Sequence, residues 1–336
     1  MSFYRRLRAR AARAGLHRPV GWLRNFGLDE HDVLLASHGR SGNTMLRFVL
    51  AEILSGVPSS FDTIQRIVPE VGLQVDTYPT LPNAGRLIKT HEPYCREYKR
   101  AIYIVRDVRD VILSSFARET AVGCMYKNLD EYIVAFLQGR MSHWGSWQSH
   151  VESWVKSPLG QSGDLLVLRF EDMRKDLEGS VVRCLEFLGK PVEPSIIRAA
   201  VRNNSVAKMR AKEQQSRRMM KISGDGRQVN TGAIERWRNV MSTEQLEVID
   251  EYAGDTLLRF GYPRGSGQAF ARDYPGCATG PRWAFSNHRV QAPKGISDCA
   301  QQVSLNLEAE THPAANRALR IRLGGRIANL FSWYAY

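Results

Sequence analysis

The chain has no long hydrophobic run and few cysteines, and these two absences narrow the classes of protein to consider. A helix that crosses a bilayer needs about 20 predominantly apolar residues, and no segment of the 336-residue sequence comes near that length. The five cysteines are scattered without a CxxC pair, which argues against a zinc site or a disulfide framework. The N-terminus also lacks the apolar stretch of a secretory signal. These absences predict a cytoplasmic protein without a bound metal.

Acidic residues are absent from both ends of the chain, where the positive charge gathers. The formal net charge is +13, and residues 1–26 and 311–336 supply seven and four arginines without an acid. The body is therefore near neutral, which argues against a specific nucleic-acid groove across it. Apolar residues recur at helical spacing in both ends. Such helices can make a peripheral contact with an anionic membrane or dock on the body with their arginines in water, and we favour docking.

Composition divides the chain into four parts. A basic N-terminal extension covers residues 1–30, and a body with regular hydrophobic patterns covers residues 31–262. Residues 263–313 are rich in glycine, proline and serine without periodicity, which indicates a linker or a surface wrap. Residues 314–336 are expected to form a basic amphipathic helix.

Short apolar runs typical of buried strands alternate with helical patterns through the body. Strands are expected at residues 33–35, 86–90, 101–105 and 164–170. Helices are expected after the first strand, at residues 107–119, along a long segment that ends at residue 189, and at residues 243–260. This alternation predicts a three-layer α/β fold, with a central parallel β-sheet flanked by helices. Ligands of such sheets bind beyond the carboxyl ends of the strands.

The turn after the first strand, SHGRSGNT at residues 37–44, has the composition of an anion site. Gly39 and Gly42 allow a tight turn and a close approach of the backbone to a ligand. Arg40 adds a full positive charge. The next residues bring hydroxyl, amide and backbone N–H groups to a helix N-terminus, namely Ser41, Asn43 and Thr44. An anion is favoured at such a helix N-terminus. The structural alternative is an ordinary strand-to-helix turn that Asn43 caps.

The residues of this turn argue against two common nucleotide sites. A Walker A loop requires GxxxxGK[ST], but the two glycines are too close together and Asn43 stands where the lysine would be. The GxGxxG fingerprint of dinucleotide-binding folds is also absent. An NTPase or a dehydrogenase is therefore disfavoured.

Three further segments carry side chains suited to catalysis or binding. KTHEP at residues 89–93 follows the second expected strand, RDVRD at residues 106–110 follows the third, and GSW at residues 145–147 leads to His150 and Trp154. Each has a structural alternative, namely a core histidine, surface ion pairs, and core tryptophans. Because parallel strands end at the same edge of a sheet, we expect the turn, the KTH segment and the arginine after the third strand to converge.

In this order, the segments resemble the PAPS-dependent sulfotransferases over about residues 32–262. The family's YPKSGTTW, KTHLP, GSWxxHVxxWW and YEDM elements have counterparts in SHGRSGNTM, KTHEP, GSWQSHVESWV and FEDM. Arg106 and Ser114 keep the family's spacing between an arginine and a serine, and NTGAIERWRN at residues 230–239 stands for the late RKGxxGxWKN element. The resemblance implies a P-loop NTPase-like sulfotransferase fold and an enzyme that transfers sulfonate from PAPS (3′-phosphoadenosine 5′-phosphosulfate) to an acceptor hydroxyl.

The resemblance also implies roles for individual residues. His91 is the expected catalytic base, Lys89 the residue that contacts the sulfonate, and Arg40 the residue that stabilises the leaving 5′-phosphate. Positions that bind the donor are expected at Arg40, Ser41, Gly42, Asn43, Thr44, Met45, Arg106, Ser114, Phe170 and Gly232. PAPS is a co-substrate in this scheme, and no metal takes part.

Two donor-binding positions depart from the family pattern, one by losing its ring and the other by losing only a hydroxyl. Met45 replaces the tryptophan that stacks on adenine in the cytosolic animal enzymes, and Phe170 replaces the tyrosine before EDM. Adenine recognition should therefore differ from that of the animal enzymes.

The late element departs more strongly. Asn230 and Thr231 stand where the family has the arginine and lysine that grip the 3′-phosphate, and Glu235 replaces the second glycine. Binding of the 3′-phosphate should therefore depend more on Arg106 and Ser114. Arg227 could substitute, although the alignment does not place it there.

Several interpretations stay open at this point. A P-loop kinase is the alternative enzyme, and a basic protein that binds nucleic acid or a membrane surface is the alternative from another class. Trp144, Trp147, His150 and residues 126–138 would suit a carbohydrate, a phenol or other small molecule, or a lipid head group as the acceptor. Transfer to an amine and the oligomeric state also stay open, because the family's dimer element falls on residues 238–247 with altered letters.

Overall fold

The computed structural model describes the body of the chain. The described residues are 24–74, 77–121, 123, 126, 128–142, 144–219 and 232–265. They belong to one compact unit, Met1–Gly276. The expected helices at the two basic ends, the 263–313 stretch beyond residue 265, and Arg227, Asn230 and Thr231 lie outside the described residues.

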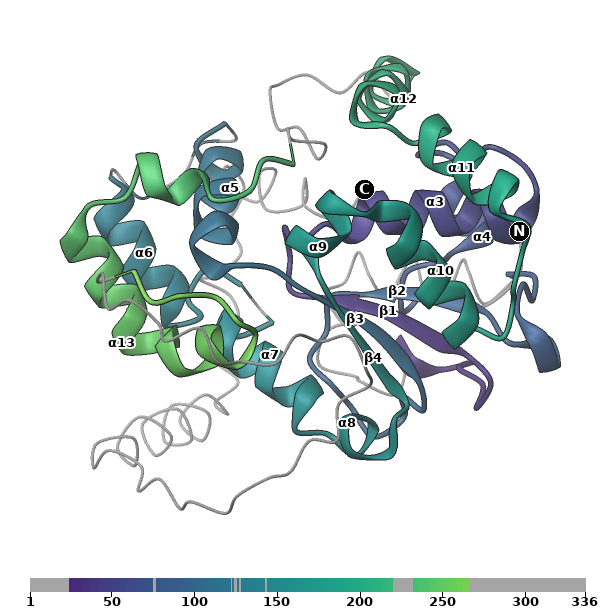
Figure 1. Cartoon of the computed structure of the whole chain (residues 1–336), viewed down its shortest axis with the longest axis horizontal. Coiled ribbons are helices and arrows are strands. Elements are labelled where there is room, and N and C mark those ends of the chain that lie inside the picture. The colour runs from purple at the N-terminus through teal and green to yellow at the C-terminus, as the bar shows by residue number, and fades with distance from the viewer. Residues whose placement is uncertain are drawn as a thin grey trace, which may run out of the picture. The chain divides into compact units, whose positions relative to one another are not determined.

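A parallel sheet of four strands forms the centre of the described residues (Figure 1). The strands are β1 (Val33–Ser37), β2 (Leu87–Thr90), β3 (Ala101–Val105) and β4 (Leu165–Arg169), in the order β2-β1-β3-β4. In the register, Leu35 pairs with Lys89 on one side and with Ile102 on the other. The turn that follows β1 is thus placed between the carboxyl ends of β2 and β3.

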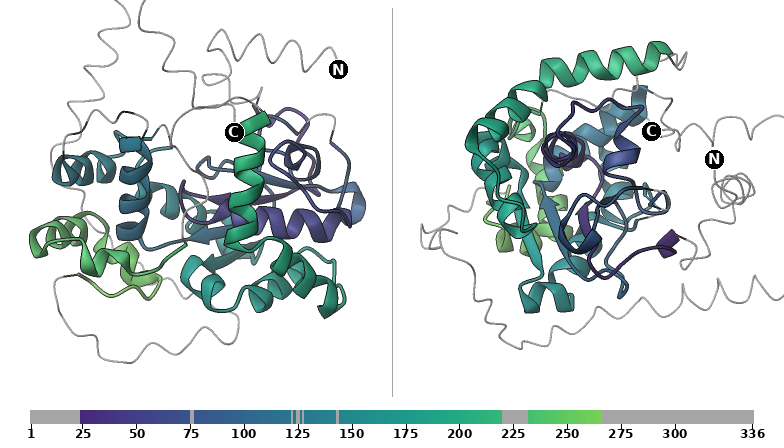
Figure 2. Two further views of the ribbon diagram at one scale, coloured as in Figure 1. Left: turned by 90° about the horizontal axis from the view of Figure 1, so that it is seen from above. Right: turned by 90° about the vertical axis from the view of Figure 1, so that its right-hand side faces the viewer.

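Alternate residues of the strands enter two separate cores, as the two-residue period of a strand requires. Leu34 and Ala36 join one core, and Val33 and Leu35 join the other. The first core is covered by α5 (Val108–Ala121), α6 (Leu129–Leu137), α7 (Trp147–Val155), α8 (Pro158–Ser162) and α13 (Thr243–Arg259). The second is covered by α3 (Asn43–Ser55), α4 (Ile64–Ile67), α9 (Phe170–Lys175), α10 (Leu177–Phe187), α11 (Pro194–Asn203) and α12 (Val206–Met219). Figures 1 and 2 show these helices to either side of the sheet, so the three-layer prediction is confirmed.

The four predicted strands agree closely with the structure. The end of the fourth strand and one predicted helix need correction. The strand at residues 101–105 is confirmed at both ends. The fourth strand ends at Arg169, since Phe170 already begins α9. The long helix expected to end at residue 189 is instead two helices. Asp176 leaves the helical conformation between them, and its carboxylate accepts a hydrogen bond from the Gly179 N–H to cap α10.

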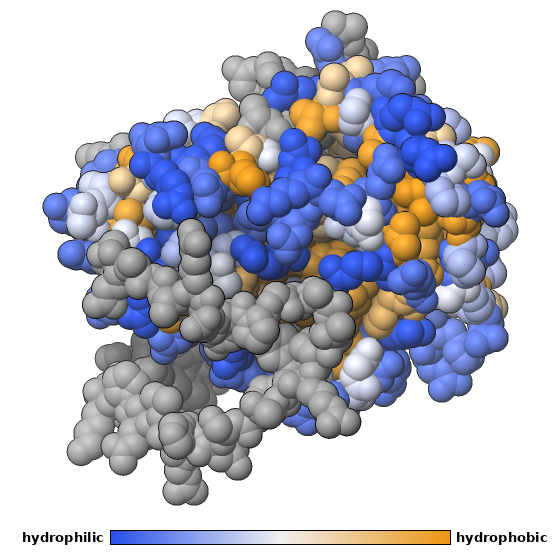
Figure 3. Space-filling view, in the orientation of Figure 1, coloured by the Kyte–Doolittle hydropathy of each residue, from blue (hydrophilic) through white to orange (hydrophobic). Residues whose placement is uncertain are grey.

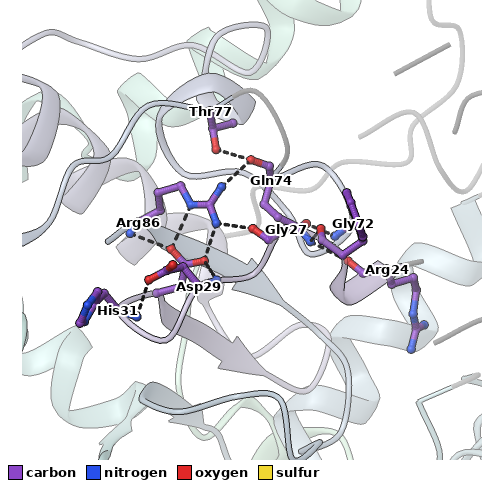
Figure 4. A network of polar contacts seen from close by, with 10 residues as sticks. Arg24, Gly27, Asp29, His31, Gly72, Gln74, Thr77 and Arg86 are labelled. Carbon is purple, nitrogen blue, oxygen red and sulfur yellow. Dashed lines mark hydrogen bonds and ion pairs between the residues drawn. The ribbon is translucent and has the colours of Figure 1, made fainter. Parts of the chain in front are cut away.

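A buried ion pair ties the start of β1 to the residue before β2 (Figure 4). The guanidinium of Arg86 contacts Asp32 through Nη2–Oδ2 at 2.5 Å and Nε–Oδ1 at 3.0 Å. Arg86 also donates to the carbonyls of Gly27 and Gln74, and Gln74 donates to the carbonyl of Phe26. Asp32 is only 1% exposed. The network therefore fixes the segment that precedes the sheet.

Arg86→Ala is expected to destabilise the fold by about 3–5 kcal/mol, because it leaves the Asp32 carboxylate buried without its partner. Chemical denaturation measures the loss. Arg96→Ala is the matched control, since the Arg96 side chain is 94% exposed in its ion pair with Glu97 and should cost less than about 0.5 kcal/mol. Equal losses in the two variants would contradict the importance of the buried pair.

The surface of the described residues mixes hydrophilic and hydrophobic side chains. On the face in Figure 3, hydrophobic side chains show between hydrophilic ones. Among the exposed large hydrophobic residues are Val182 of α10 and Ile196 of α11. Within the described ranges, every helix falls short of the length and apolar content that a bilayer crossing requires.

Candidate functional site

The turn between β1 and α3 is built from left-handed backbone at two positions. Arg40 has φ 67° and Gly42 has φ 93°. Gly42 is the N-cap of α3, so the structural alternative in which Asn43 caps the helix is wrong. The Asn43 amide instead donates to the Leu35 carbonyl at 3.0 Å and to Ser37 Oγ at 3.3 Å, which ties the turn to β1. The N–H groups of the first turn of α3 are left without a side-chain cap, as an anion site requires.

Gly42 has a second constraint besides its positive φ. A Cβ at this position would overlap the ring of Phe170, the first residue of α9. The phenyl ring therefore closes the turn from the side of β4.

Gly42→Ala is expected to lower affinity for an anionic nucleotide such as PAP (3′-phosphoadenosine 5′-phosphate) by about 100-fold, because backbone strain and the overlap with Phe170 each cost on the order of 1–3 kcal/mol. Calorimetric titration measures the affinity. Gly56→Ala is the matched control, since Gly56 also has a positive φ (73°) but no atom lies within 4 Å of its added Cβ. If both variants bound PAP like the parent protein, the turn would not be the nucleotide site.

Arg40, Ser114 and Arg106 meet at the mouth of the turn. Arg40 Nε donates to Ser114 Oγ of α5 at 3.1 Å. Arg106, just beyond β3, donates through Nη1 to the Arg40 carbonyl at 3.1 Å and through Nη2 to the Ala233 carbonyl at 2.9 Å. The sequence prediction that these segments converge is confirmed. The pKa of Arg40 is lowered to about 10 by burial and by the charges of Arg118 and Arg106. A bound anion would relieve this mutual repulsion.

Arg106 is held on several sides. Its guanidinium lies 4.3 Å from the centre of the Phe170 ring, and its Nη2 lies 3.8 Å from the carboxylate of Asp110. Asp110 in turn accepts a hydrogen bond from the Glu235 N–H at 2.8 Å. The arginine therefore connects the turn, α5 and the late segment that begins at Gly232.

Two buried hydrogen-bond donors at this mouth have no partner within the described part of the chain. They are Ser41 Oγ and Arg106 Nε. A buried donor without a partner costs about 1–3 kcal/mol, so such groups call for a ligand. Both atoms suit a phosphate group.

His91 lies at the end of β2 with a defined tautomer. Its Nδ1 is 2.8 Å from the Ser37 carbonyl, which can only accept, so Nδ1 carries the proton and Nε2 keeps its lone pair. The pKa of His91 is lowered well below its usual value, chiefly by burial and then by the charge of Lys89. The imidazole is therefore neutral at pH 7, as a general base must be.

His150 and its neighbours support the backbone at His91. His150 Nε2 donates to the His91 carbonyl at 3.0 Å, and the Tyr103 hydroxyl donates to His150 Nδ1 at 2.9 Å. Trp154 Nε1 donates to the Glu92 carbonyl at 3.1 Å. Trp154 belongs to the core, as does Trp147, so the structural alternative holds for these two tryptophans.

Aromatic side chains surround the other side of His91. The Trp144 ring centre lies 5.0 Å from that of His91. Phe136 of α6 and Trp144 both pack edge-on against His38. Trp144 thus provides an aromatic wall beside His91, and the buried His38 and the core residue Phe136 back it.

Lys89 is buried at the same edge. Its ammonium donates to Glu70 Oε1 at 2.9 Å. Its backbone is held as well, since Lys89 N donates to the Pro69 carbonyl and the Val71 N–H donates to the Lys89 carbonyl. The segment around Glu70 thus lies alongside β2.

The remaining predicted residues lie on the periphery of this arrangement. Thr44 is partly buried in the first turn of α3, and Met45 packs against the second core. Gly232 has φ 65° and lies against Arg174, where an added Cβ would come within 3.3 Å of its Nε.

Comparison with known proteins identifies the family. A family model described as the sulfotransferase domain matches residues 30–261. The chain belongs to the sulfotransferase family. Sulfotransferase 2A1 of Mus musculus is 26% identical to it over 71% of this chain and 88% of the relative. Sulfotransferase 2A6 of Rattus norvegicus is 25% identical over the same shares of the two chains.

Solved structures show the same fold. Retinol dehydratase in complex with androsterone and the inactive cofactor PAP aligns with a TM-score of 0.57 and 23% identity, over 70% of this chain and 83% of that one. Mouse sulfotransferase SULT7A1 complexed with PAP aligns with a TM-score of 0.53 and 23% identity, over 70% and 87%.

Three contacts of the candidate site were not expected from the sequence. Glu70 pairs with Lys89, Tyr103 orients His150, and His38 packs between Phe136 and Trp144. Glu70 and Tyr103 fall outside the family motifs, so no local signal marks them. His38 stands within the SHGRSGNT turn, where its neighbours drew attention to phosphate rather than to the aromatic wall.

Proposed function

We propose that this sulfotransferase transfers the sulfonate group of PAPS to an acceptor hydroxyl and releases PAP. The convergence of the turn, His91 and Lys89 at one sheet edge carries the proposal. The buried Ser41 Oγ and Arg106 Nε without partners fit a phosphorylated donor, and the PAP complexes of the structural relatives support the same donor. PAPS supplies the activated sulfonate as a co-substrate.

The donor is held at its two phosphates by different residues in this proposal. Arg40, Ser41, Gly42, Asn43 and Thr44 hold the 5′-phosphosulfate through the N-terminus of α3. Arg106 and Ser114 hold the 3′-phosphate, with Phe170, Met45 and Gly232 beside the nucleotide. The contact between Arg40 and Ser114 joins the two phosphate positions.

His91 acts as the general base. Its Nε2 accepts the proton of the acceptor hydroxyl while the acceptor oxygen forms a bond to sulfur and the bond from sulfur to the 5′-phosphate oxygen breaks. Arg40 and the N–H groups of residues 41–44 stabilise the charge that develops on the leaving phosphate, and Lys89 stabilises the sulfonate oxygens. Because an arginine is always protonated, Arg40 acts through its charge and not as a proton donor.

The acceptor in this proposal is a small molecule with a hydroxyl group. The aromatic wall of Trp144 beside His91, backed by the buried His38 and Phe136, supports an acceptor with an apolar body.

Incubation with sulfur-labelled PAPS and a panel of alcohols, phenols and sugars tests the function. The proposal predicts a labelled sulfate ester that requires both PAPS and an acceptor. Phosphate transfer from labelled ATP to the same acceptors, without transfer from PAPS, would overturn it.

A further inference from the structure

A second ionic cluster includes Lys89 of the candidate reaction centre, whose side chain is 9% exposed, and Glu70, whose side chain is 29% exposed. Glu70 Oε1 accepts from Lys89 Nζ at 2.9 Å. Gln65 Oε1 accepts from the Glu70 N–H and from Arg47 Nη2, each at 3.0 Å. Arg47, on α3, is only 6% exposed and also donates to the Val68 carbonyl. The carboxylate of Glu70 thus lies among two buried cations.

The backbone fixes the place of Glu70 relative to Lys89. The two residues form a parallel bridge, with hydrogen bonds of 2.7 Å from Lys89 N to the Pro69 carbonyl and 2.8 Å from Val71 N to the Lys89 carbonyl. Register in such a bridge is set by the backbone, so the carboxylate is presented to the lysine at a fixed position. A surface ion pair lacks this preorganisation.

The charges that face Lys89 come from several elements. Arg47 of α3 and Arg118 of α5 are positively charged, Glu70 is the acid paired with it, and the nearby His91 at the end of β2 is titratable but neutral. Burial, Arg47 and Arg118 lower the pKa of Lys89, while Glu70 raises it. Without Glu70, burial and the two arginines would favour the neutral amine of Lys89.

We propose that Glu70 is a positioning residue of the transfer reaction, which holds the Lys89 ammonium in its charged form and aims it along the sheet edge at the sulfonate. This inference rests on the proposed function, in which Lys89 contacts the sulfonate. A protonated lysine stabilises those oxygens through its positive charge, which the neutral amine lacks, so Glu70 extends strong sulfonate binding to higher pH.

Donor binding tests the proposal without any acceptor. PAPS differs from PAP by its sulfonate, so the ratio of the two affinities reports the contacts at the sulfonate. Calorimetric titrations of the full chain between pH 7 and pH 10 give this ratio. In the parent protein the ratio of PAPS affinity to PAP affinity should stay constant to high pH. In Glu70→Gln the ratio should fall by about 10-fold as the pH rises, and the fall should begin at a lower pH than in the parent protein. Glu70→Asp should restore part of the parent behaviour.

Two further variants separate the possible failures. Lys89→Met should lower the relative affinity for PAPS at every pH, and an unchanged ratio would refute the proposed role of Lys89. If Lys89→Met lowers the ratio but Glu70→Gln follows the parent protein at every pH, the role of Glu70 is refuted. Glu52→Gln is the matched control, because Glu52 is a buried carboxylate of α3 that pairs with Asn203 and Asn204, and it should follow the parent protein.

Discussion

Replacing His91 with alanine is expected to lower turnover by about 10²–10⁴-fold while PAP binding stays nearly intact. The imidazole has Nδ1 bound to the Ser37 carbonyl, which leaves Nε2 to accept the proton. Its removal takes away the base but none of the contacts to the phosphates. Steady-state kinetics and a PAP titration on the same preparation measure the two effects.

His31→Ala is the control for this prediction, because the His31 side chain is 44% exposed and lies before β1. It should keep full turnover. Loss of PAP binding in His91→Ala, with unchanged turnover by whatever enzyme still binds donor, would refute the assignment of the base.

The environment of His91 also predicts the pH profile of the reaction. Burial and the charge of Lys89 lower its pKa well below 6.5, so the base stays unprotonated as the pH falls below that value. The acid limb of kcat/KM in the parent enzyme should therefore lie below pH 6.5. A limb at or above pH 6.5 would mean that another group acts as the base.

Replacing Arg106 with alanine is expected to weaken PAP binding by about 10–100-fold, and the binding of adenosine 5′-phosphosulfate far less. A charge-assisted hydrogen bond contributes about 1.5–3 kcal/mol, and only PAP has the 3′-phosphate. The variant also loses the hydrogen bonds to Arg40 and Ala233, which should affect both nucleotides alike. The ratio of the two affinities therefore measures how much Arg106 contributes to binding of the 3′-phosphate.

Ser114→Ala provides a second variant for the same ratio. It removes the hydroxyl that accepts from Arg40 and should also affect PAP more than adenosine 5′-phosphosulfate. Equal losses for the two nucleotides in Arg106→Ala would show that Arg106 supports the turn and does not contact the 3′-phosphate.

The sequence predicts the sheet and the meeting of its loops because both follow from local patterns. The apolar residues of β3 form an uninterrupted run with clear ends, and the structure reproduces that strand. The contact between Arg40 and Ser114 joins residues 74 positions apart, yet it follows from parallel strands that end at one edge.

The supporting contacts of the site could not be predicted in the same way. The pairing of Glu70 with Lys89 depends on the position of the segment at Pro69 beside β2. No sequence motif predicts this position. The break at Asp176 was hidden because the hydrophobic period continues across it. Long-range register and a single capping residue decided these features.

The most direct test of the account is a comparison of PAP and ATP binding to the full chain by calorimetry. The turn lacks the Walker lysine, and the buried Oγ of Ser41 in the turn and Nε of Arg106 beyond β3 are free to bind the phosphates of PAP. We expect PAP to bind and stabilise the protein, ATP to bind much more weakly, and Gly42→Ala to bind PAP about 100-fold more weakly than the parent protein. Tighter binding of ATP than of PAP would contradict it.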